Sequence, residues 1–266
     1  MKLRKRTLIL LILAVIVGMA AFQVQKNRAS ARDWRTASFE PVGLAPDPAK
    51  VREPVIQVYA ARAWGWRGYF GVHSWVAVKP QDADYFTVYE VIGWRLRWGD
   101  SAVVIRQRDA DSRWFGKAPE LLSDIRGPGV GALIKKVDAA AHSYPYAQKY
   151  TVWPGPNSNT FIAHILREVP ELKVDLPPTA IGKDYIPDST FAKSPSGTGY
   201  QLSLGGLLGV MAATEEGLEL NLLGLTFGID PLDPALKLPL VGRIGPDRET
   251  KRTLAGPAAI ENLAEN

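Results

Sequence analysis

The 266-residue sequence contains no cysteine. This absence excludes disulfide bonds, thiolate metal sites and a cysteine nucleophile. Histidine is nearly as scarce, with three residues, and the chain has no phosphate-binding loop, no dinucleotide fingerprint and no dense cluster of metal ligands. We therefore expect neither a cofactor nor a bound metal.

Acidic residues are missing from the first 32 positions, which hold seven lysines and arginines. Subtracting these seven from the 32 basic residues of the chain leaves 25, against 27 acidic residues, so the remaining body is nearly neutral. A nucleic-acid-binding surface is strongly basic, and we therefore expect no nucleic acid partner.

Residues 7–24 form an uncharged, mostly apolar run of 18 positions, just long enough to span a bilayer. The basic residues before it orient the N-terminus toward the cytoplasm. A cleaved signal peptide is the alternative, because residues 29–31 read Ala-Ser-Ala, a sequence typical of cleavage sites. We favour an uncleaved anchor, because Lys26 and Arg28 lie between the run and that site. For a bacterial chain this predicts a single-pass inner-membrane protein with a periplasmic C-terminal domain.

Composition divides the chain into four segments. We expect a membrane anchor at 1–26, a proline-rich linker at 27–50, an α+β core at 51–170 and a Pro/Gly-rich extension at 171–266. The extension has few helix signals, so we expect it to pack on the core rather than fold alone.

Hydrophobic periodicity predicts the elements of the core. Strands are expected at 55–61, 72–79, 85–94 and 102–107, and helices at 132–142 and 158–169. The strand at 72–79 is apolar on both faces, so we expect it at the centre of the sheet and in a hairpin with the next strand. Beyond Pro170 the pattern predicts two apolar strands within 200–227, around a turn at 214–217, and then an irregular segment at 230–243.

The stretch from Trp153 to Phe161, WPGPNSNTF, begins the second helix. Asn157 is a favourable N-cap, and Ser158 shares the apolar face of Phe161 and Ile162. A hydroxyl at the first turn lies near free N–H groups and the positive end of the helix dipole, a suitable place for a nucleophile. Serine and asparagine also cluster at helix starts for capping alone, and this interpretation stays open.

The three histidines differ in their prospects as a partner for Ser158. His142 is near the end of a predicted helix, where a cation is favoured without any function. His164 is six residues beyond Ser158, about 120° away around the same helix, and cannot reach it. His73 lies in the predicted central strand. It is either a catalytic base or a buried histidine whose ring is hydrogen-bonded and has no catalytic role.

The order of these features resembles the circularly permuted branch of the papain-like superfamily, which includes lecithin–retinol acyltransferase-type enzymes and bacterial amidases. There, a strand with a histidine precedes a helix that begins N-C-x-x-F, and here Asn157, Ser158 and Phe161 match that pattern with serine at the cysteine position. The resemblance implies Ser158 as nucleophile, His73 as general base and a polar residue on the next strand that orients the imidazole. Glu90 is the candidate for this third residue, with its neighbour Tyr89 as the alternative if the strand register differs by one. Aromatic candidates for the pocket walls are Trp64, Trp66, Tyr69 and Trp75.

Nearly the whole chain after the anchor also resembles a family of bacterial membrane-anchored proteins known as domain of unknown function 3750. The resemblance rests on WGWRGYFGVHSW, WPGPNSNTF and GLELNLLGLTFGIDPLDPALKLP, and it implies no known activity. Together the features predict a membrane-anchored envelope protein that acts as a Ser-His hydrolase or acyltransferase on an amide, ester or lipid. The alternative is an inactive papain-like domain with a binding or structural role, because serine forms a nucleophilic anion far less readily than cysteine.

Overall fold

The computed structural model describes residues 34–186 and 189–254, with Thr7, Gly18 and Ala21. The predicted membrane anchor at 7–24 and the possible cleavage site at 29–31 therefore lie outside the described residues, apart from those three positions. Within the described part, no helix combines the length and the apolar character needed to cross a membrane.

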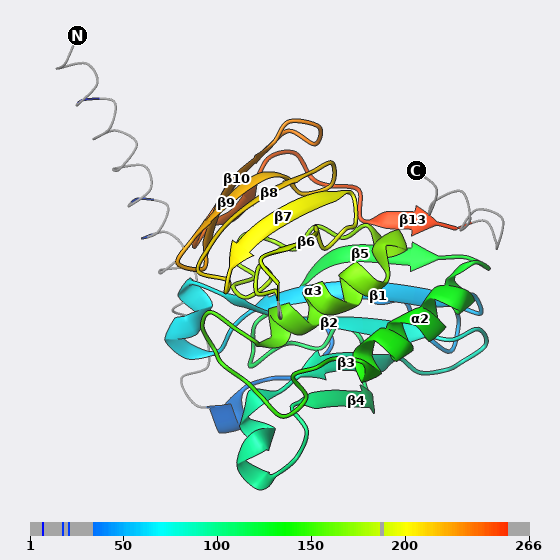
Figure 1. Ribbon diagram of the computed structural model, residues 1–266. Helices are drawn as coiled ribbons and strands as arrows, with labels where there is room; N and C mark the ends of the chain where they lie inside the picture. The colour runs from blue at the N-terminus through cyan, green and yellow to red at the C-terminus, as the bar shows by residue number, and fades with distance from the viewer. Residues whose placement is uncertain (1–6, 8–17, 19–20, 22–33, 187–188, 255–266) are drawn as a thin grey trace.

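A six-stranded sheet is the centre of the fold (Figure 1). Its strands are β1 (Val55–Arg62), β2 (Val72–Lys79), β3 (Thr87–Val91), β4 (Val103–Gln107), β5 (Glu120–Arg126) and β13 (Lys251–Thr253). They lie in the order β13-β5-β1-β2-β3-β4, antiparallel except for the pair β13 and β5. The predicted central position of β2 and its hairpin with β3 are confirmed, with Val76 opposite Tyr89. Strands β5 and β13 were not predicted from the sequence pattern.

Two helices, α2 (Val130–His142) and α3 (Ser158–Glu168), lie side by side across one face of this sheet (Figure 1). As predicted, Asn157 caps α3: its side chain accepts hydrogen bonds from the backbone N–H groups of Asn159 and Thr160. The apolar stripe that begins at Phe161 packs into a core with one set of strand side chains. On β2 and β3 this set includes Val76, Val78, Tyr89 and Val91.

Alternate residues of the same strands point to the opposite face, which neither α2 nor α3 covers. Trp75, Ala77 and Val88 there form a second buried cluster with Ala110 and Trp114. The sheet is thus apolar on both faces, as the pattern of β2 predicts. The remaining helical turns are η1 (Trp34–Thr36), η2 (Gly65–Tyr69), η3 (Gly93–Trp98) and η4 (Pro170–Leu172).

The segment after α3 forms a second, seven-stranded antiparallel sheet. Its strands are β6 (Phe191–Lys193), β7 (Gly199–Leu204), β8 (Leu208–Ala213), β9 (Gly217–Leu222), β10 (Leu225–Asp230), β11 (Ala235–Leu238) and β12 (Gly242–Ile244), paired in sequence order. The prediction of two strands within 200–227 is wrong, because further turns at Gly205-Gly206 and Leu223-Gly224 divide the region into four. The segment 230–243, predicted to be irregular, contains β11 and the start of β12.

Polar contacts join the second sheet to the segment that follows α3. Lys183 is buried and paired with Glu219 of β9, and the Ser203 hydroxyl of β7 donates to the carbonyl of Asp184. Lys237 of β11 is fully buried and lies 2.7 Å from Asp175. The chain is therefore an α+β protein, as predicted, in which buried ion pairs join the second sheet to the segment that follows α3.

Candidate functional site

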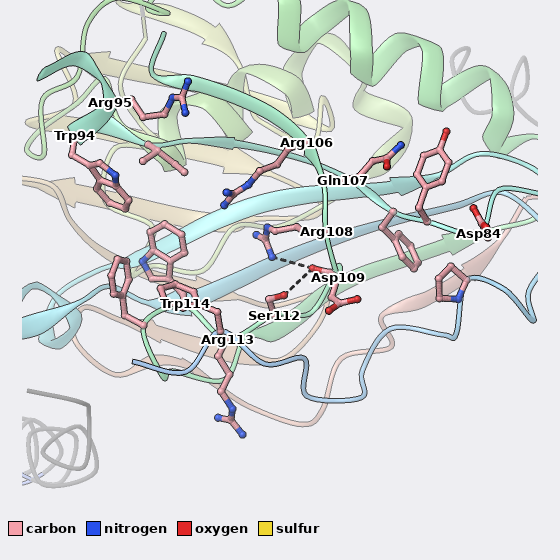
Figure 2. Close-up of a pocket in the computed structure, with 16 residues that line it drawn as sticks. Asp84, Trp94, Arg95, Arg106, Gln107, Arg108, Asp109, Ser112, Arg113 and Trp114 are labelled. Carbon is pink, nitrogen blue, oxygen red and sulfur yellow. Dashed lines mark hydrogen bonds between the residues drawn. The ribbon is translucent and has the colours of Figure 1, made fainter. Parts of the chain in front are cut away.

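A groove of about 790 Å³ opens on the face of the first sheet opposite α2 and α3 (Figure 2). Its aromatic lining is Phe39, Tyr85, Phe86, Trp94, Trp114 and Phe115, and its charged lining is Asp84, Arg95, Arg106, Arg108, Asp109 and Arg113. The side chains come from the segment before β1, from the residues on either side of β3, and from η3, β4 and the loop after β4.

Stacked and edge-on rings build the aromatic wall of the groove. The rings of Trp94 and Trp114 stack with their centroids 5.9 Å apart, and Phe115 meets Trp114 edge-on at 5.0 Å. Phe39, from the segment before β1, packs edge-on against Phe115 at 5.1 Å. Because Trp94 is also partly exposed, the wall offers a flat apolar surface to a ligand.

Two arginines of the groove share one buried carboxylate. Nη2 of Arg106 lies 3.0 Å and Nε of Arg108 lies 3.5 Å from Oε1 of Glu90, whose side chain is fully buried. The guanidinium groups of Arg106 and Arg108 both point toward the side of the groove occupied by Trp94 and Trp114 (Figure 2). The Arg106 side chain is half exposed, so its charge faces solvent within the groove.

His73 completes this cluster from β2. Its Nε2 lies 3.1 Å from Oε2 of Glu90, and its ring stacks on Trp114 with centroids 3.7 Å apart. Burial lowers the pKa of His73 despite the opposing effect of Glu90. Burial alone would raise the pKa of Glu90, but the hydrogen bond from His73 and the charges of Arg108 and Arg106 lower it to about 2.

The cluster therefore carries a net positive charge at neutral pH. His73 is neutral and, facing a carboxylate, donates its Nε2 proton; Glu90 is ionised; Arg106 and Arg108 are both charged. Two guanidinium groups against one carboxylate leave one positive charge beside an aromatic wall. Such an arrangement is suited to holding an anionic group through charge-assisted hydrogen bonds.

The structure brings His73 and Glu90 together but does not bring Ser158 to them. The Ser74 hydroxyl donates to Oδ1 of Asn159 at 2.8 Å, which places the start of α3 on the face of β2 that carries Ser74. His73 precedes Ser74 in the strand and points to the opposite face, among Glu90 and Trp114. The predicted meeting of Ser158 and His73 is therefore wrong: the sheet lies between them.

The polar side chains of WPGPNSNTF form hydrogen bonds that hold a neighbouring segment of the chain in place. Side-chain amide groups of Asn157 and Asn159 donate to the carbonyl of Ile181, at 3.0 and 2.8 Å, and the Thr160 hydroxyl donates to the carbonyl of Gly182 at 2.8 Å. The first turn of α3 thus fastens the segment that leads to the second sheet. Ser158 is buried within this turn. The capping interpretation, which the sequence left open, accounts for these contacts.

None of the four aromatic residues predicted as pocket walls lines the groove. Trp75 is buried in the core, Trp66 is well exposed, and Tyr69 is half-buried, while the ring of Trp64 packs against that of Phe115. The groove uses Trp94 and Trp114 instead. Arg106 in β4 and Arg108 just after it are two residues apart and face the same side, toward Glu90, and this spacing of two basic residues is a signal that could have indicated the site.

Histidine, aspartate and glutamate form no group of three that could hold a metal ion within the described residues. His164, which the sequence analysis excluded as a partner of Ser158, lies 3.1 Å from the carbonyl of Ala140 and joins α3 to α2.

A family model described as "Protein of unknown function (DUF3750)" matches residues 53–185, which is half of the chain. The chain belongs to this family. The DUF3750 match covers β1 to β5, both helices and most of the groove, and it ends before the second sheet. Comparison with curated proteins gave no match, and neither did comparison with solved structures.

Proposed function

We propose that this DUF3750 protein is a non-catalytic binding protein of the bacterial cell envelope, and that its groove takes a ligand with an anionic group beside a flat ring. The convergence of Arg106 and Arg108 on Glu90 next to a Trp wall carries this proposal. It corresponds to the alternative function derived from the sequence, a papain-like domain that binds rather than hydrolyses.

The shared carboxylate explains why the arginines are available to a ligand. Glu90 holds both guanidinium groups in place, yet its single charge neutralises only one of them. Arg108 is further fixed by the ring of Trp75, 5.2 Å away, and by the carbonyl of Asp109. An anion that enters beside Arg106 would meet a preorganised charge and would lose little side-chain entropy.

Hydrolysis by a Ser-His pair has less support. The nucleophile and the base that it requires lie on opposite faces of a sheet, and Trp114 covers the ring of His73 on the groove side. General base catalysis needs hydrogen-bond reach between the two groups.

We also propose that the protein is held at the inner membrane by residues 7–24, with its cytoplasmic N-terminus preceding this span and the groove in the periplasm. The support is the uncharged run of 18 residues after four basic residues. In this location the groove would meet anionic envelope components rather than nucleic acid.

Calorimetric titration of the full-length protein with phenyl phosphate tests the binding function, with inorganic phosphate and phenol as partial probes. Phenyl phosphate should bind at least tenfold more tightly than either part, and added salt should weaken it. Arg106→Gln and Trp94→Ala should each weaken binding at least tenfold, whereas Arg97→Gln, an exposed arginine outside the groove, should not. Binding that is absent, or unchanged in Arg106→Gln, would refute the proposal.

A further inference from the structure

The second sheet has its apolar face outside and its polar face inside. Residues that point inward include Gln201, Ser203, Glu219, Asn221, Thr226 and Lys237, all buried. Their neighbours in sequence point outward and are mostly leucine. In a sheet of a monomeric protein the apolar side normally packs on the core. The exposure of the apolar side of this sheet to solvent is therefore unusual and indicates that something covers it.

The outward side chains form continuous rows across the strands. One row runs Leu202, Val210, Leu220, Phe227 on β7 to β10, and a second runs Leu218, Ile229, Leu236, Ile244 on β9 to β12. Tyr200, Leu204, Leu208, Leu222 and Phe191 extend the surface to the remaining strands, and these thirteen residues are each between 37% and 58% exposed. We call them the outer apolar face.

This face is large enough for a stable protein interface. Thirteen large side chains, each about half exposed, present on the order of 1,000 Å², whereas the largest apolar patch on a typical monomer is about 300–600 Å². A standard interface buries about 800 Å² on each partner. The outer apolar face therefore equals one side of such an interface.

The charge of the outer apolar face indicates whether a lipid surface or a second copy of the chain covers it. Among the outward positions of the seven strands, Lys193 at the edge strand β6 is the one charged residue. Surfaces that rest on anionic lipid headgroups normally carry several lysines or arginines, which this face lacks. An uncharged face can instead meet its own copy without like-charge repulsion, as a two-fold interface requires.

Shape favours the same occupant. A hollow of about 390 Å³ lies over Gly228, surrounded by Leu218, Leu220, Phe227, Ile229, Leu236 and Leu238. It can accept side chains from an opposing sheet. Edge-to-edge pairing would gain little, because the edge strands β6 and β12 have three residues each.

We infer that the outer apolar face binds the same face of a second copy of this chain, forming a two-fold dimer in which two seven-stranded sheets pack face to face. Sheets packed in this way lie about 10 Å apart. The row that contains Val210, Leu220 and Phe227 crosses β9, the central strand of the seven, so we expect a two-fold axis through the centre of the patch to pass near these residues.

The absence of cysteine makes a direct test possible. Single cysteines at Val210, Leu220 and Phe227 are introduced into the full-length protein in phosphatidylcholine vesicles and treated with a bis-maleimide that spans about 10 Å, the expected sheet separation. At least one of them should give a covalent dimer tenfold more efficiently than Lys135→Cys, an exposed position on α2. Adding Leu220→Asp to Val210→Cys should abolish the product, and adding Trp98→Asp, at an exposed aromatic residue elsewhere, should not.

Two outcomes would overturn the inference. If no cysteine cross-links above the α2 control and a fluorophore on the Leu220→Cys protein is quenched by quencher-bearing lipids, the occupant is the bilayer. If none cross-links and the fluorophore stays accessible to aqueous quenchers alone, the face is uncovered and the protein is a monomer.

Discussion

The hydroxyl of Ser74 donates to the side-chain carbonyl of Asn159 at 2.8 Å and thereby fixes which face of the first sheet receives α3. Asn159 also donates to the carbonyl of Val72, so one side chain grips β2 on both sides of His73. Because neighbouring residues of a strand point to opposite faces, His73 must point away from the helix. The His73 ring therefore contacts Glu90 on the groove side of the sheet.

Ser158→Ala should leave serine-reactive labelling of the protein unchanged. Ser158 lies on the helix side of the sheet, and its expected base His73 lies on the other, so His73 cannot activate the hydroxyl. Labelling of purified full-length protein with a fluorophosphonate measures this, with Ser143→Ala as the matched control. Labelling that disappears in Ser158→Ala alone would restore the hydrolase hypothesis.

Glu90→Gln should lower the free energy of unfolding by about 3 kcal/mol. The substitution removes the buried carboxylate that pairs with Arg106 and Arg108, and it leaves the mostly buried charge of Arg108 without an ion-pair partner in this cluster, which is costly. Chemical denaturation at pH 7 measures the effect, and Glu168→Gln, an exposed residue near the end of α3, should change stability by less than about 0.5 kcal/mol. Equal effects of the two substitutions would show that the Glu90 carboxylate does not stabilise the folded protein through Arg106 and Arg108.

The contribution of Glu90 should also depend on pH. Its pKa is lowered in the folded state from 4.5 to about 2, so the stabilisation is fully present above the unfolded pKa and is lost as the pH falls from about 4.5 to about 2. The stability difference between wild type and Glu90→Gln should be constant above pH 5 and should shrink below pH 4. A difference that grows on acidification would contradict this sign.

Lys237→Met should destabilise the protein by about 3–5 kcal/mol. Lys237 is fully buried between Asp175 at 2.7 Å and Glu219 at 2.8 Å, and its loss leaves two carboxylates with Lys183 as their remaining buried cation. Thermal unfolding measures the loss, and Lys251→Met, at an exposed lysine, is the control. Adding Asp175→Asn to Lys237→Met should recover part of the stability, because it removes a buried carboxylate that has lost Lys237 and keeps only Arg248, 3.2 Å away, as its partner. A further loss of stability would argue against the pairing of Lys237 with Asp175.

The mature protein should retain residues 7–24. Lys26 and Arg28 between the apolar run and Ala29-Ser30-Ala31 are unfavourable for signal-peptide cleavage. Intact-mass measurement of protein extracted from membranes checks this, and a mature N-terminus at Arg32 would disprove the anchor. The Ala31→Leu variant serves as the mass reference. The substitution would block cleavage after residue 31, so this variant should have the mass of the uncleaved chain whether or not the wild-type protein is cleaved.

Local signals allowed the sequence to predict the elements, but not the faces on which they pack. The Asn157 cap and the apolar spacing from Phe161 involve neighbours within one turn, so α3 was predicted to begin where it does. Which side of β2 the helix covers depends on a distant contact, Ser74 with Asn159. Because β2 is apolar on both faces, its pattern gave no preference, and the resemblance to papain-like enzymes led to the wrong face.

In the second sheet, too, the sequence predicts a strand but not the face to which its apolar side chains point. Leu218, Leu220 and Leu222 alternate with Glu219 and Asn221, which predicts a strand but not that its leucines point outward. Their direction is set by buried partners far along the chain, such as Lys183. The turn at Leu223-Gly224 was missed because leucine at φ 55° replaces the asparagine that usually announces such a turn.

The parallel pair of β13 and β5 decides where this polypeptide can be cut. Lys251 to Thr253 lie beside Asp124 to Arg126, and the N–H of Asp124 donates to the carbonyl of Thr250 at 2.7 Å. A truncated chain that ended at Tyr185, where the family match ends, would therefore leave the backbone of β5 as an unsatisfied outer strand. Such a fragment would be prone to aggregate through this edge, and a soluble domain would have to extend to Leu254.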